Sequence, residues 1–297
     1  MKSAKSIEEQ IKLLLQYGVI INDPEKAKEI LLDIGYYRLG FYFFPFETTH
    51  PEIDNRTHYV VNGTHFEDAV SLYYFDFDLR HILSRYLTRV EIAFRTYLTH
   101  YMSLKYNTDP IWFVNSNIIN QNYINSFDSK VYNTSAFKKN PQISRHHKKY
   151  TNDKYAPAWK TLEFMTFGSI VKLYKSIISI EDKKAISAHF GIIKYSVFET
   201  FIDAIYILRN KCAHGAVLFD LTLPNGISGK GIKLGLKGDE FQKLIGTLTV
   251  LEFILNIISP NRARDYKNQL TELYSNFKKR SANNVIKVLE NCSGIKI

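Results

Sequence analysis

The sequence contains few of the residues that cross-link, break or kink a chain. Its 297 residues include two cysteines, Cys212 and Cys292, eight prolines and 14 glycines. Two cysteines without a C-x-x-C spacing cannot form a zinc site by themselves and indicate no disulfide framework, so we expect a reducing, cytoplasmic compartment. Because proline and glycine are scarce, long segments are free to form helices.

Long apolar runs are also missing. The most apolar stretch, residues 244–259, is interrupted by Glu252 and Asn256, which favours a buried helix over a membrane span. Glu8, Glu9 and Gln10 stand where a signal peptide needs its apolar core. The sequence therefore predicts a protein that neither spans a membrane nor carries a secretion signal.

Several common catalytic signatures are absent. The chain has no G-x-S-x-G elbow, no H-E-x-x-H pair and no dinucleotide fingerprint followed by an acidic residue. The glycine-rich stretch at residues 221–240 lacks the ending of a P-loop, so we expect a small β-hairpin or a loop there. His146 and His147 adjoin each other but point in different directions, and we expect neither a metal site nor a cofactor.

Positive charge and aromatic side chains are abundant. The chain has 39 Lys and Arg against 29 Asp and Glu, a formal net charge of +10, and 20 residues each of Tyr and Phe. A polyanion is a natural partner for such a chain, although many lysine-rich proteins are basic without binding one. With 45% apolar residues, the chain is able to bury a sizeable core.

Helical periodicity dominates the sequence. In the longest repeat, apolar residues such as Phe77, Tyr86 and Phe94 recur at three- and four-residue steps. Thr64 and Glu67 form a candidate capping box before it. A short strand is expected at residues 59–61. The predicted helices, which make the fold predominantly all-α, are residues 6–17, 24–34, 66–106, 159–179, 183–190, 196–209, 240–259 and 262–289.

The segment from residue 107 to residue 154 is polar and ends in a basic patch. We favour a solvated, mobile loop here over a surface that grips phosphate. If the protein binds RNA, this loop is a leading candidate for the contact. The cations and histidines concerned are Lys138, Lys139, Arg145, His146, His147, Lys148, Lys149 and Lys154.

The segment IYILRNKCAHGAVLFD brings Arg209, Asn210 and His214 to the end of an apolar helical run. Arginine grips phosphate with two parallel hydrogen bonds, and histidine takes and gives protons near neutral pH. Asparagine is able to hold either partner in place. These groups suffice to cleave RNA without a metal, because a base activates the 2′-hydroxyl, a cation stabilises the phosphorane and an acid protonates the leaving oxygen.

The Arg-x-x-x-x-His spacing is weak evidence by itself. Arg95 and His100 share it, and a helix-end ion pair with a capping histidine is the common structural explanation. Five helical residues also rotate the chain by roughly 140°, so the two side chains would not share a face. Either the helix ends near Ala213, or another chain completes the site.

Four blocks of sequence, in order, resemble the Abi family of bacterial abortive-infection proteins, the AbiD and AbiF group. The first two are IGYYRLGFYFFPF at residues 34–46 and the segment at residues 63–98 that contains FDFDLR. The last two are PAWKTLEFMTFGSIVKLY at residues 157–174 and LRNKCAHGAVLFD at residues 208–220. Together the blocks are spread over about two thirds of the chain, and their order is far more specific than any single motif.

The resemblance implies membership of the HEPN superfamily, whose members are helical bundles with an Arg-x(4–6)-His motif. It would make Arg209, Asn210 and His214 that motif. It also implies a HEPN-like core at residues 61–297 with an N-terminal helical extension at residues 1–60. HEPN ribonucleases usually act as homodimers, and some relatives are restrained by a small structured noncoding RNA, so RNA and a second copy are the expected partners.

Two further groups of residues enter through the resemblance. Arg80, Glu91 and Arg95 match the family's FDxxLR…E…R block and form either a polar shell around the motif or an internal ion-pair network. Tyr37 and Arg38, with Tyr36, lie in an aromatic cluster that either stacks on RNA bases or packs in the core.

These observations predict an abortive-infection protein that acts as a metal-independent HEPN endoribonuclease toxin restrained by a noncoding RNA. The alternative is a non-catalytic protein that assembles with a structured noncoding RNA.

Overall fold

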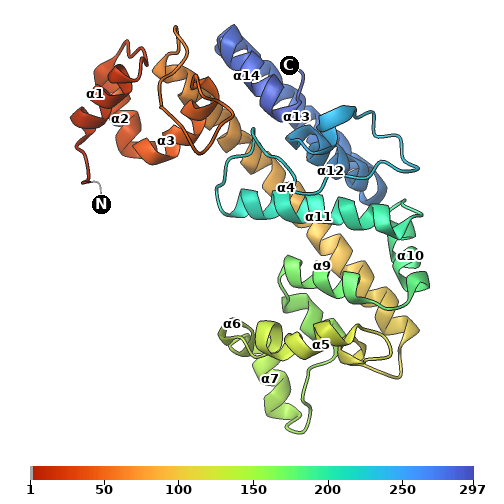
Figure 1. The fold of residues 1–297 in the computed structure, drawn as a ribbon. Helices are drawn as coiled ribbons and strands as arrows, with labels where there is room; N and C mark the ends of the chain where they lie inside the picture. The colour runs from red at the N-terminus through yellow and green to blue at the C-terminus, as the bar shows by residue number, and fades with distance from the viewer. Residues whose placement is uncertain (1–2) are drawn as a thin grey trace.

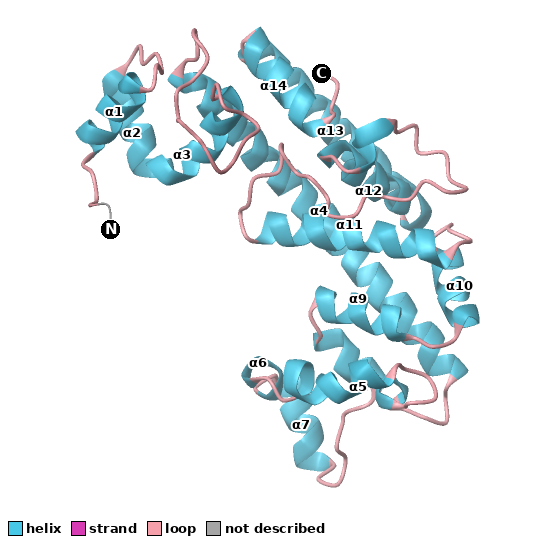
Figure 2. Cartoon of the chain, viewed as in Figure 1, coloured by secondary structure: helices cyan, strands magenta, loops and turns pink. Residues whose placement is uncertain are grey.

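The computed structural model describes residues 3–297 as 14 α-helices joined by loops and short 3-10 and π turns, with no β-strand among them (Figures 1 and 2). The predicted all-α fold is confirmed. The strand expected at residues 59–61 is wrong, because Val60 forms only an isolated bridge with Glu47. The glycine-rich stretch is a loop whose pairing is limited to a bridge between Thr222 and Lys243. No helix among residues 3–297 is long and apolar enough to cross a membrane.

The chain begins with three helices, α1 (Ile7–Gln16), α2 (Pro24–Ile34) and α3 (Tyr36–Phe43). Asp23 caps α2 by accepting a hydrogen bond from the Lys26 amide, as Asp-Pro at a helix start predicts. The sequence does not predict α3, because its aromatic residues obscure the helical period. The inner face of α3 is buried and packs on the next helix.

Helix α4 (Phe66–Lys105) has 40 residues and is therefore about 60 Å long. It runs through the molecule and touches the N-terminal, central and C-terminal helices (Figure 1). The carboxylate of Asp68 caps the helix by accepting a hydrogen bond from the His65 amide. The capping box is thus formed by His65 and Asp68, one residue after the predicted pair of Thr64 and Glu67. Phe77, although part of the apolar repeat, is 40% exposed, whereas Phe75 is buried.

Four C-terminal helices pack along α4. They are α11 (Tyr195–Ala213), α12 (Leu244–Ile258), α13 (Pro260–Arg280) and α14 (Asn283–Ser293). The single helix predicted at residues 262–289 is thus two helices, because the backbone becomes extended at Ser281.

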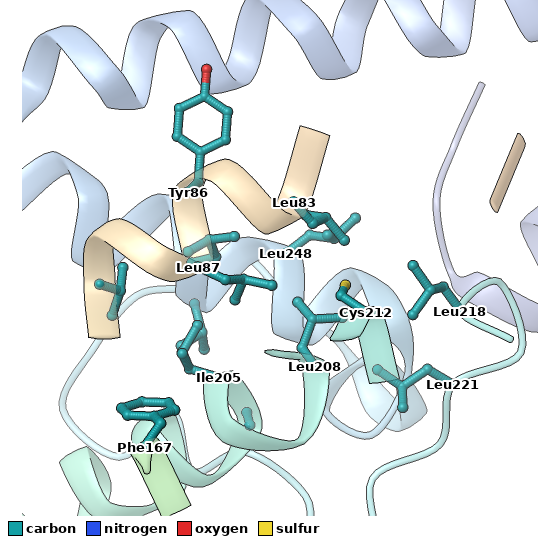
Figure 3. Close-up of a cluster of buried hydrophobic side chains, with 14 of the residues drawn as sticks. Leu83, Tyr86, Leu87, Phe167, Ile205, Leu208, Cys212, Leu218, Leu221 and Leu248 are labelled. Carbon is teal, nitrogen blue, oxygen red and sulfur yellow. The ribbon is translucent and has the colours of Figure 1, made fainter. Parts of the chain in front are cut away.

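The core between α4, α11 and α12 positions the end of α11. Leu83 and Leu87 of α4 face Ile205 and Leu208 of α11, and Leu248 of α12 closes the cluster (Figure 3). All five side chains are buried, and the burial of each stabilises the fold by roughly 1.5–3 kcal/mol. This packing fixes the depth and rotation of α11.

Helices α5 (Gln121–Phe127), α6 (Ser135–Lys138) and α7 (Pro141–Lys149) form a lobe at the far end of α4 (Figure 1). The loop expected over this segment is therefore wrong. Asn140 caps α7 by accepting the amides of Gln142 and Ile143.

Three shorter helices connect this lobe to α11: α8 (Ala158–Thr161), α9 (Phe167–Ser176) and α10 (Ile180–His189). The single helix expected at residues 159–179 is interrupted, because Thr166 caps α9 by accepting the Ser169 amide. Helix α9 packs on both α4 and α11.

Candidate active site at the end of helix α11

The three motif residues lie where α11 ends. Arg209 and Asn210 are in its last two turns, the helix stops at Ala213, and His214 is the C-cap. The next residue, Gly215, has φ +63°, and the amide of Ala216 donates to the carbonyl of Lys211 at 2.9 Å. This is the glycine-terminated end that left-handed backbone allows, and the chain leaves the helix directly after His214.

Glu91 of α4 holds two arginines together. Arg209 Nε donates to Glu91 Oε2 at 3.1 Å, and Arg95 Nη2 donates to Glu91 Oε1 at 2.9 Å. Arg95 Nη2 also donates to the carbonyl of Met165 at 3.1 Å. Glu91 and Arg95 are buried, so this network both braces α4 against α11 and borders the motif.

The Arg209 side chain is only partly used by this network. Glu91 takes its Nε–H, and Nη1 lies 3.5 Å from Oδ1 of Asn210. Among residues 3–297, Nη2 has no hydrogen-bond acceptor, and 38% of the side chain is exposed. A guanidinium anchored through Nε presents its remaining N–H groups as a fork for an oxyanion.

His214 follows this anchored arginine in the chain and is exposed at the surface. Its backbone amide donates to the carbonyl of Asn210 at 3.0 Å. Within the part of the chain that the structure describes, no side chain forms a hydrogen bond with its imidazole. Both ring nitrogens are therefore free to form hydrogen bonds with a bound molecule.

The segment after His214 is tied to α3 and α4 by side chains. Arg38 Nη1 donates to the carbonyl of Gly215 at 2.9 Å, and Arg80 Nη2 donates to the carbonyl of Ala216 at 2.9 Å. These two arginines belong to the predicted groups, but both act on the backbone next to the motif. They fix where His214 leaves the helix.

Asp76 of α4 completes this attachment, and sequence reasoning missed it as an individual site residue. Its carboxylate accepts the amides of Leu218 and Phe219 at 2.6 and 2.8 Å and the Tyr42 hydroxyl at 3.2 Å. Burial raises the pKa of Asp76 to about 7, although those two amides and Arg80 act in the opposite direction. The fully buried carboxyl is thus a structural anchor for residues 218–219.

The remaining predicted residues lie away from Arg209. Tyr37 is 82% exposed, whereas Tyr42 and Phe43 of the same aromatic cluster are buried. In the α6–α7 lobe, His146 is buried and His147 Nε2 lies 2.9 Å from the Tyr132 hydroxyl. The exposed cations there are Lys138, Lys139, Arg145, Lys148 and Lys149.

Comparison with known families decides the membership of this chain. A family model described as Abi-like protein matches residues 29–220, well over half of the chain. The chain belongs to the Abi-like protein family. No curated protein and no solved structure is significantly similar to it.

The Abi-like match covers every contact of the candidate site. It begins within α2, includes Arg38, Glu91 and Arg209, and ends directly after the segment that Asp76 anchors. Helices α12 to α14 lie outside the match, yet they pack against α4. From residue 3 to residue 297, no three His, Cys, Asp or Glu side chains are grouped as metal ligands would be.

Proposed function

We propose that this Abi-like protein is an abortive-infection toxin of the HEPN type that cleaves RNA without a metal. The observation that carries the proposal is the pairing of Arg209 with the buried Glu91, beside an exposed His214 at the end of the same helix. A fixed cation and a free imidazole are two of the elements that phosphodiester transfer requires.

The proposed reaction is transfer of the phosphate to the neighbouring hydroxyl. A base removes the proton of the ribose 2′-hydroxyl, the 2′-oxygen attacks phosphorus, and the bond to the 5′-oxygen breaks as an acid gives that oxygen a proton. Arg209 stabilises the crowded phosphorane, and Asn210 orients Arg209 or the phosphate. The products are a 2′,3′-cyclic phosphate and a 5′-hydroxyl.

One imidazole cannot serve as base and acid at once on opposite sides of the phosphate. A homodimer that places two copies of the motif across one groove supplies the second His214. We therefore propose that the active form contains two chains, each with its own Glu91-anchored arginine.

The proposed regulator is a structured noncoding RNA that binds the basic surface and restrains cleavage. The second candidate function is a non-catalytic protein that assembles with such an RNA. The observation that favours it is the absence, in the described residues 3–297, of any side chain that orients the His214 ring.

Incubation of purified protein, stripped of bound nucleic acid, with end-labelled RNA distinguishes the two candidates. The ribonuclease proposal expects fragments with 2′,3′-cyclic phosphate ends, formed equally with and without EDTA. If the protein is verified to be a dimer and binds the RNA without producing any fragment, the result supports the second candidate function.

Gly215→Ala is expected to impair cleavage through the position of His214. A Cβ at this site makes only ordinary contacts with Arg38, so the cost is the left-handed backbone, about 1–2 kcal/mol of unfolding free energy. Gly63→Ala is the matched control, because Gly63 also has positive φ and lies before α4, away from the motif. Thermal unfolding should show similar losses for both variants, and cleavage should fall only for Gly215→Ala.

Exposed cations of α7 are expected to contribute to RNA affinity. For single-stranded RNA, removing one phosphate contact should reduce the magnitude of the slope of log affinity against log salt concentration by roughly 0.7. The triple change Arg145→Gln, Lys148→Gln and Lys149→Gln should therefore reduce it by about 2. An unchanged slope would remove α7 from the RNA interface. The matched control replaces three exposed lysines of the glycine-rich loop, Lys230, Lys233 and Lys237.

A further inference from the structure

A pocket of about 990 Å³ lies in the N-terminal part of the chain, with α1 and α3 among its walls. Its lining includes five aromatic side chains, which are Tyr17, Tyr36, Tyr37, Phe41 and Phe43. Tyr37 and Phe41 remain exposed, and their rings pack edge to face at 5.2 Å. Exposed aromatic rings around a hollow offer stacking surfaces to a planar ligand.

The same pocket contains polar groups that a purely apolar ligand would leave unused. Gln10 Nε2 donates to the carbonyl of Lys5, but its Oε1 is buried and has no hydrogen-bond partner among residues 3–297. Glu47, also in the lining, is buried and paired with Arg56, whose Nε donates to Glu47 Oε2 at 3.0 Å. The pocket thus places a fixed ion pair beside the rings.

Gly40 keeps the pocket open from inside α3. An added Cβ at this position meets no atom within 4 Å, and Gly40 lines the pocket. Glycine in a helix interior costs about 1 kcal/mol relative to alanine, so α3 is less stable here than alanine would make it. A methyl group at position 40 therefore meets no neighbour, and a larger side chain there would take up part of the pocket that Gly40 lines.

Helix α3 connects this pocket to the motif. Tyr37 lines the pocket, and the next residue, Arg38, donates to the carbonyl of Gly215 beside His214. The pocket and the candidate active site therefore lie on two sides of one short helix.

We propose that this pocket holds one unpaired base of the RNA whose backbone reaches the Arg209 motif, and so selects which RNA is cut. The inference rests on the proposed RNA substrate. A nucleobase stacks on tyrosine and phenylalanine, carries polar edge groups suited to a lining that includes the Glu47–Arg56 ion pair, and is attached to the polyanion that a chain of net charge +10 attracts.

The test measures binding of short single-stranded homopolymeric RNAs to the full-length His214→Ala protein, which leaves the RNA intact. Gly40→Leu, which fills the pocket, should weaken binding of the preferred RNA about tenfold or more and reduce the differences between homopolymers. Gly40→Ala should stay within about twofold of the parent. Tyr37→Ala should weaken binding in the same way, Tyr37→Phe should not, and Tyr74→Ala, which lies outside the pocket, is the control.

Equal affinity of the parent, Gly40→Leu and Tyr37→Ala proteins for every RNA overturns the proposal. Mononucleotide binding that Gly40→Leu abolishes, with RNA binding unchanged, also overturns it and makes the occupant a free nucleotide. If RNA binding depends on the pocket but the wild type cuts no RNA, the pocket assignment stands and the ribonuclease proposal fails.

Discussion

Replacing His214 by alanine is expected to abolish RNA cleavage and growth arrest while RNA binding stays within about twofold of the wild type. General acid–base catalysis by a positioned side chain contributes roughly 10²- to 10⁴-fold to a rate, so the initial rate should fall by about that factor. Arg209→Ala should lower it about 10²- to 10³-fold, because the phosphorane loses its cation. Initial rates on labelled RNA and growth after induced expression measure both effects.

The chain offers its own control for this experiment. Arg95 and His100 have the same spacing as the motif, but Arg95 is buried and His100 lies within α4. His100→Ala should therefore cleave RNA like the wild type. Arg209→Lys, which keeps the charge but loses the fork, should have intermediate activity. If His214→Ala is as toxic as the wild type at equal protein levels and neither protein cleaves RNA, the motif is structural and the second candidate function replaces the first.

Asp76→Ala is expected to have the largest effect on stability, a loss of at least about 3 kcal/mol in the free energy of unfolding. The change leaves the Leu218 and Phe219 amides and the Tyr42 hydroxyl without their acceptor, at roughly 1–3 kcal/mol for each unpaired buried group. Chemical denaturation monitored by circular dichroism measures the loss.

Asp78→Ala is the matched control, because Asp78 is on the same helix but pairs at the surface with Arg280. It should change stability by less than about 1 kcal/mol. A loss for Asp76→Ala as small as this would contradict the anchoring role.

The Asp76 carboxyl also predicts a pH dependence of stability. Its pKa is raised to about 7 in the folded chain, so its stabilising contribution is present at low pH and is lost as pH rises towards 7. Asp76→Asn is neutral throughout. The unfolding free energy of the wild type minus that of Asp76→Asn should therefore fall by on the order of 1–2 kcal/mol from about pH 5.5 to about pH 8. If this difference in unfolding free energy grows with pH, the raised pKa of Asp76 is contradicted.

Local signals determine how much of the fold the sequence predicts. Asp23-Pro24 locates the start of α2 at the residue where the structure has it, and the apolar repeat predicts α4 to within one residue at its end. Helix α3 and the helices of the α6–α7 lobe are not predicted by the sequence. They are short, between 4 and 9 residues, and tertiary burial of residues such as Tyr42 and Ile143 stabilises them more than their own propensity.

The candidate site is predictable in its residue types but not in its contacts. The sequence points to Arg209, His214 and Glu91, yet only the packing of α4 on α11 shows that Glu91 binds the Nε of Arg209. Asp76 and Asp78 look alike in FDFDLR, although one is buried and the other is at the surface. A pattern of alternating acidic and aromatic residues does not reveal which of two carboxylates faces the core.

The separation of Glu91 and Arg209 along the chain has a consequence during translation. The pair that anchors the motif is 118 residues apart, and a bacterial ribosome adds roughly 5–20 residues per second. The nascent chain therefore carries α4 for roughly 6–24 s before the arginine partner exists. The ion pair forms only when α11 docks on α4. Most of the polypeptide has therefore been synthesised before the motif is assembled.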